Sequence, residues 1–83
     1  MTASANRIPS VRQLEAYGGN RPGSNAAALV EVWHRDLVRD IEGLNDGTIL
    51  PWGGATKAGE LRKTRRQLLR LIANARAVGI DLD

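Results

Sequence analysis

The chain has 83 residues, no cysteine and no phenylalanine. A single domain of this size buries only about 60% of its unfolded surface, so its core must be thin. The composition excludes disulfides and zinc–thiolate sites, and no apolar run approaches the roughly 18 residues of a membrane-spanning helix.

The charge and the thin core together predict association. The net charge of +3 favours an acidic partner, most commonly nucleic acid, although a charge of this size on a small protein is also ordinary for solubility. A thin core without disulfides favours stabilisation by a homo-oligomer or by a larger protein partner. The first residues do not follow the pattern of a signal peptide, so we expect a cytoplasmic protein that does not contact a membrane.

The first third of the chain predicts an arm, a short helix and a connector. Residues 1–8 are small and polar, and predict a disordered arm ahead of one helical domain over residues 9–83. Ser10 is a good N-cap, and Gln13 completes a capping box. The glycine-rich residues 18–24 end this helix after about two turns and lack the P-loop pattern GxxxxGK[ST].

A second helix is predicted over residues 25–42, with Ser24 or Asn25 as its N-cap. Its apolar side chains recur every three or four residues, and Trp33, the largest, is expected to anchor the core. The outer face is acidic and contains arginines that can pair along the helix, as Glu31–Arg35 and Asp36–Arg39. The other carboxylates of this face are those of Asp40 and Glu42.

Residues 43–55 predict a break between helices, because Asn45-Asp46-Gly47 is a typical turn sequence. Three large apolar residues follow the turn: Ile49, Leu50 and Trp52. They permit two interpretations. They can pack back onto the helix pair, which we favour, or they can form an exposed knob that binds a protein partner.

The most distinctive segment is a basic helix over residues 56–78, with Thr56 as N-cap and Gly79 just beyond its end. Residues 56–79 carry a formal charge of +6, so the rest of the chain sums to −3. The apolar positions of this helix follow steps of three and four. The cations predicted to contact DNA phosphates lie on or near the opposite face and are Arg62, Lys63, Arg66 and Arg70. The alternative is that these side chains pair with the acidic second helix, of the same subunit or of a neighbour.

The sequence therefore predicts an all-α fold, in which two long amphipathic helices form an antiparallel hairpin and the short N-terminal helix packs across one end. A catalytic function is not expected. The only histidine, His34, points about 200° away from Asp36 on a helix, so the two do not converge on a metal or a proton. We expect no enzyme, no metal and no cofactor.

Residues 9–25, PSVRQLEAYGGNRPGSN, resemble the N-terminal segment of one group of phage small terminase subunits. The matching positions, which include a tryptophan and an acidic-leucine pair farther on, are Pro9, Ser10, Leu14, Gly18, Gly19, Arg21, Pro22, Asn25, Trp33, Asp36 and Leu37. The resemblance implies a viral DNA packaging component of the host cytoplasm, which forms rings, binds DNA and delivers it to a large motor subunit.

Two other functions compete with this one. The chain can be a protein-binding adaptor or inhibitor that uses residues 49–52 and the basic helix against an acidic protein surface. It can also be a transcriptional regulator with a helix-turn-helix built from its first two helices. The connector of about seven residues is longer than the three or four that a helix-turn-helix uses.

Overall fold

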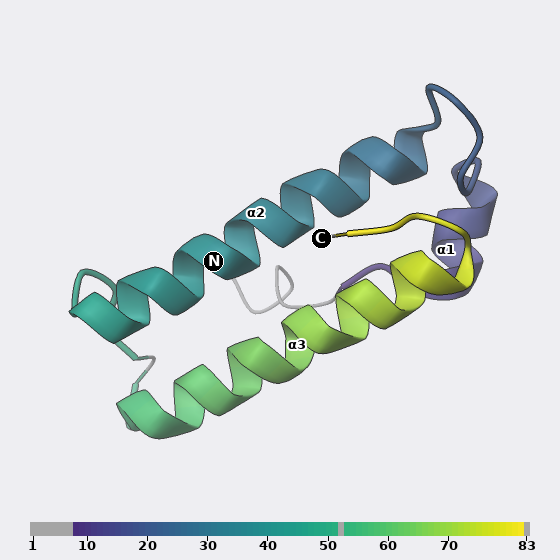
Figure 1. Cartoon of the computed structure of the whole chain (residues 1–83). Helices are drawn as coiled ribbons and strands as arrows, with labels where there is room; N and C mark the ends of the chain where they lie inside the picture. The colour runs from purple at the N-terminus through teal and green to yellow at the C-terminus, as the bar shows by residue number, and fades with distance from the viewer. Residues whose placement is uncertain (1–7, 52, 83) are drawn as a thin grey trace.

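The computed structural model describes residues 8–51 and 53–82 and contains three helices: α1 (Val11–Ala16), α2 (Asn25–Asp46) and α3 (Lys57–Ala77). No strand occurs in this part of the chain. α2 and α3 lie side by side and antiparallel, and α1 packs against both at the end where α2 begins (Figure 1). The predicted all-α hairpin is confirmed.

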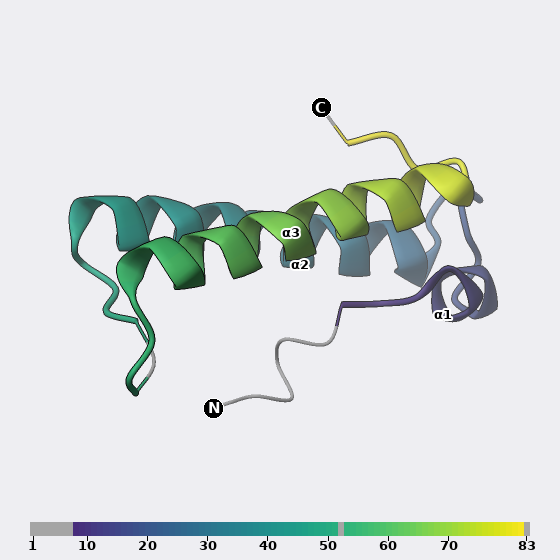
Figure 2. The same cartoon turned by 90° about the horizontal axis from the view of Figure 1, so that it is seen from below.

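The two faces of the hairpin are covered differently. α1 and the loop between α2 and α3 lie on one side of the hairpin, whereas the C-terminal segment lies on the other (Figure 2). The Asn74 amide donates a hydrogen bond of 3.0 Å to the carbonyl of Pro9, which is buried. This contact fixes the start of the described chain against α3. The predicted arm falls outside the described residues except for Ile8, which is half-buried.

α1 begins and ends as the sequence predicts. The Ser10 side chain accepts from the Gln13 N–H at 3.2 Å, and the Gln13 side chain accepts from the Ser10 N–H at 2.9 Å, which completes the capping box. At the other end Gly18 has a φ of 107° and the Gly19 N–H donates to the Leu14 carbonyl at 2.8 Å. This left-handed turn is a Schellman motif, which directs the chain away from α1.

α2 starts after its N-cap Ser24 and continues to Asp46, so the predicted break at Gly43 was wrong. Gly43 is buried inside the helix, where the Ile49 side chain packs against the space that its own side chain would fill. The Ile49 N–H also donates to the Gly43 carbonyl at 3.0 Å. The turn sequence does end the helix, but at Gly47, whose φ of 87° is left-handed.

The core lies where the three helices meet, and small side chains allow them to approach closely. Leu14 of α1, Val30 of α2 and Leu71 of α3 are the largest side chains that are fully buried. Ala26 and Ala75 are also fully buried. Trp33, which was expected to anchor the core, is only half-buried.

The ends of α3 follow local sequence signals. The Thr56 side chain caps its first turn by accepting from the Gly59 N–H at 3.0 Å. After α3, Gly79 has a φ of 85° and the Ile80 N–H donates to the Ala75 carbonyl at 2.9 Å. Ile80 and Leu82 then pack against the core, so the chain beyond α3 is held to the hairpin.

Candidate nucleic-acid interface

The four cations predicted to contact DNA share one exposed face of α3, which we call the basic face: Arg62, Lys63, Arg66 and Arg70. Arg62, Arg66 and Arg70 are four residues apart, so the helical rise places them about 6 Å apart in a row about 12 Å long. Lys63 precedes Arg66 by three residues and Arg70 by seven, which keeps it on the same face. The helix therefore presents a short band of positive charge that spreads over about 100° of its circumference.

None of these four side chains forms an ion pair or a hydrogen bond with another residue of the described chain. Two of the five carboxylates of α2 pair within α2 itself, as predicted: Glu31 lies 3.9 Å from Arg35, and Asp36 lies 2.8 Å from Arg39. Pairing between the basic face and the acidic helix of the same chain is thus absent among the described residues. Pairing with a neighbouring chain stays a prediction.

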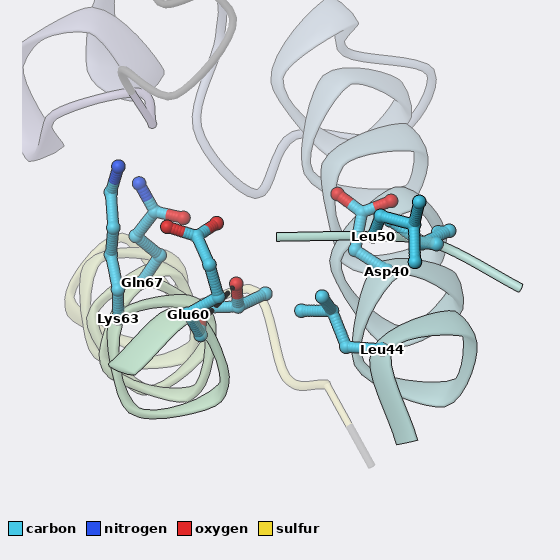
Figure 3. Close-up of a pocket in the computed structure, with 8 residues that line it drawn as sticks. Asp40, Leu44, Leu50, Glu60, Lys63 and Gln67 are labelled. Atoms are coloured by element: carbon cyan, nitrogen blue, oxygen red, sulfur yellow. Dashed lines mark hydrogen bonds between the residues drawn. The ribbon is translucent and has the colours of Figure 1, made fainter. Parts of the chain in front are cut away.

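Lys63 lies at the border between the basic face and a shallow hollow of about 170 Å³ between the two long helices. Figure 3 shows Asp40 on the α2 side of this hollow and Glu60, Lys63 and Gln67 on the α3 side. Leu50 contributes an apolar side chain from the loop. The hollow therefore brings carboxylates of both helices next to the edge of the basic face.

The carboxyl group of Asp40, which lines the hollow, has a raised pKa. Partial burial raises the pKa of Asp40, and the nearby carboxylate of Asp36 raises it further, whereas Arg39 opposes the shift. The negative charge of Asp40 is thus less favourable here than in water.

Of the predicted partner-binding residues, Ile49 and Leu50 are described by the structure, and their side chains differ in exposure. Ile49 packs back against Gly43, in agreement with the favoured interpretation. Leu50 is 79% exposed and fits the alternative of a knob. Trp52 lies outside the described residues.

The start of this loop is fixed by polar contacts. The Asp46 carboxylate accepts hydrogen bonds from the Thr48 N–H at 3.0 Å and from the Thr48 hydroxyl at 2.7 Å. These hydrogen bonds lower the pKa of Asp46. Lys57 donates to the Asn45 carbonyl at 2.9 Å and joins the end of α2 to the start of α3.

Sequence reasoning missed the exposed apolar side chains of the long helices. Leu69 is 67% exposed on α3, and Val32 is 48% exposed on α2. The signal for Leu69 was present, because Leu68 and Leu69 are consecutive and point about 100° apart, so one buried stripe cannot hold both. Tyr17, just after α1, is 51% exposed and lies beside Leu29 and Val32.

Within the described residues, no three His, Asp or Glu side chains are grouped so that they could hold a metal ion. His34 is half-buried on α2. None of the described helices has the length and apolar character that crossing a lipid bilayer requires. No family model matches the sequence, and no curated protein or solved structure matches it either.

Proposed function

We propose that this protein has no catalytic activity and binds the backbone of duplex DNA through the basic face of α3. The observation that carries the proposal is that Arg62, Lys63, Arg66 and Arg70 are all exposed and that none pairs with another described side chain. Unpaired guanidinium groups in a row are suited to phosphate, because each binds two oxygens of one group.

The same face favours backbone contacts over base recognition. Its side chains are three arginines and a lysine, and α3 contains no aromatic residue that could stack on bases. Phosphate contacts position a protein on DNA without distinguishing sequences. We therefore propose binding that depends on salt and little on DNA sequence.

The biological setting that we propose is viral DNA packaging, in a homo-oligomer that also contacts a larger protein. Support comes from the resemblance of residues 9–25 to small terminase subunits and from the basic face itself. An adaptor function is the second candidate. It is favoured by Leu50, which is 79% exposed in the loop between α2 and α3.

The test compares two variants that remove the same charge from different helices. Arg66→Ala/Arg70→Ala shortens the basic face, whereas Arg35→Ala/Arg39→Ala removes two arginines of α2 that are also exposed. Binding to a labelled 20-base-pair duplex is followed by fluorescence anisotropy at low salt. Hydrogen bonds to charged groups contribute about 1.5 kcal/mol or more, so the first variant should bind at least about tenfold more weakly than the wild-type protein.

The control variant should bind within about twofold of the wild-type protein, since its arginines lie among the α2 carboxylates. Equal losses in both variants would mean that net charge alone drives binding. Unchanged binding by Arg66→Ala/Arg70→Ala would exclude the basic face as the DNA surface. In that case, capture of a protein partner that is lost in Leu50→Asp would favour the adaptor function.

A further inference from the structure

The hairpin has two exposed apolar surfaces. The one on α3 has cations beside it, and the one on α2 has carboxylates beside it. On α3, Leu69 is 67% exposed and has Arg65 and Arg66 within one helical turn. On α2, Val32 is 48% exposed and has Glu31 beside it and Asp36 one turn away. A single exposed apolar side chain is ordinary on a protein surface, whereas several that adjoin one another, as on α2, are characteristic of contact surfaces.

On α3 the apolar surface is the single side chain of Leu69, whereas on α2 it is a shallow depression lined by several residues. Tyr17, Leu29 and Val32 line it together with Asn25 and Ala28. Tyr17 comes from the turn after α1, so two elements build the depression. It offers a place for one protruding aliphatic side chain.

We propose that the two surfaces bind each other between copies of this chain, head to tail. Leu69 of one copy inserts into the depression formed by Tyr17, Leu29 and Val32 of the next copy. Arg65 of the first copy then lies near Glu31 of the second. Each copy has one surface of each kind, so every chain binds one neighbour with α3 and another with α2.

The charges of the two helices identify a second copy as the occupant. α2 contains five carboxylates against two arginines, whereas α3 contains seven cations against one carboxylate. A contact between two α3 helices or between two α2 helices would oppose like charges, so only the unlike combination is complementary. The present partners of Glu31 and Asp36 are exposed arginines, and exposed ion pairs are weak, so they can be exchanged.

The contact covers one edge of the basic face and leaves the other edge accessible. At about 100° per residue, Leu69 points within about 20° of Arg62, but about 100° away from Arg70 and about 120° away from Lys63. One side of α3 can thus bind a neighbour while another faces DNA. A contact of this kind joins two different surfaces and generates a closed ring or an open chain.

The experiment blocks each surface separately and then mixes the blocked proteins. Leu69→Asp and Val32→Asp change exposed helix positions, and Leu50→Asp is a matched control in the loop. Light scattering after size-exclusion chromatography gives the mass. The wild-type protein and Leu50→Asp should form oligomers, and each of the two blocked variants alone should be a monomer.

An equimolar mixture of the two blocked variants should give a heterodimer with twice the mass of one chain, because each variant retains the surface that the other has lost. Three results would overturn the proposal: a mixture that stays monomeric, a Leu69→Asp protein that assembles like the wild-type protein, or a wild-type protein that is itself a monomer. Circular dichroism verifies the helices, and Leu69→Gln and Val32→Gln repeat the test with uncharged residues. DNA binding by monomeric Val32→Asp, in which α3 is intact, tests the proposed function independently of assembly.

Discussion

Replacing Gly43 with alanine should destabilise the protein, although alanine is the better helix former. Inside a helix, glycine costs about 1 kcal/mol relative to alanine. An alanine Cβ at this position would overlap Cγ1 and Cδ1 of Ile49 and would lie 3.1 Å from its Cβ. The Ile49 backbone is held in place, because its N–H donates to the Gly43 carbonyl at 3.0 Å, so rotation of the side chain does not remove the close contact with its Cβ. Overpacking costs about 1–3 kcal/mol, so the net loss should reach up to about 2 kcal/mol.

The assay is a double-mutant cycle measured by urea unfolding. Ile49→Ala removes the atoms that overlap, so Gly43→Ala in that background should raise the free energy of unfolding by up to about 1 kcal/mol. The sign of the change at residue 43 therefore depends on the side chain at residue 49. A Gly43→Ala protein that is more stable than the wild-type protein would refute this account of why α2 continues through a glycine.

Two further predictions concern the core and the loop. Leu71→Ala should lower the free energy of unfolding by about 2–5 kcal/mol in urea, because Leu71 is fully buried. Leu50→Ala, at an exposed site outside the proposed contact between copies, should change it by less than about 0.5 kcal/mol, and equal effects would contradict the assigned core. Hydrogen bonds from Thr48 hold the pKa of Asp46 below its ordinary value, so Asp46 stabilises the fold above that ordinary value and loses this effect as the pH falls through its lowered pKa. Thr48→Val should raise the pKa of Asp46 in an NMR titration, and an unchanged pKa would contradict these contacts.

The helix termini could be predicted because their signals are local. Each signal lies within a few residues of the helix end that it determines. The N-cap signals are Ser10 with Gln13 for α1 and Thr56 for α3, and the C-terminal signal of α3 is Gly79. Such hydrogen bonds depend on sequence spacing and hardly on tertiary structure. The hairpin follows from two amphipathic helices of similar length.

The continuation of α2 through Gly43 could not be predicted from local signals. A glycine at position 43 usually favours a break, but here the packing of Ile49 makes it suitable inside the helix. The prediction that Trp33 anchors the core failed for a related reason. Leu14 of α1 packs with Val30 and Ala75 in the core, and only the docking of α1 decides which side chain is central.

The sequence predicted that the cations of the candidate site are exposed. It did not predict whether they pair with carboxylates of α2. Helical spacing gave the exposure of Arg66 and Arg70 on α3. It also gave the pairs within α2, such as Asp36 with Arg39. Whether the cations of α3 reach the carboxylates of α2 depends on how each helix is rotated about its own axis in the hairpin. A single sequence does not specify this rotation.

The salt dependence of DNA binding tests the proposed function most directly. Four phosphate contacts per chain predict a slope of about −3.6 for the logarithm of the binding constant against the logarithm of the salt concentration. Binding should then weaken by about a hundredfold between 50 and 200 mM salt, and the slope should fall to about −1.8 in Arg66→Ala/Arg70→Ala. A wild-type slope near zero, or the same slope in both proteins, would contradict DNA binding by the basic face of α3.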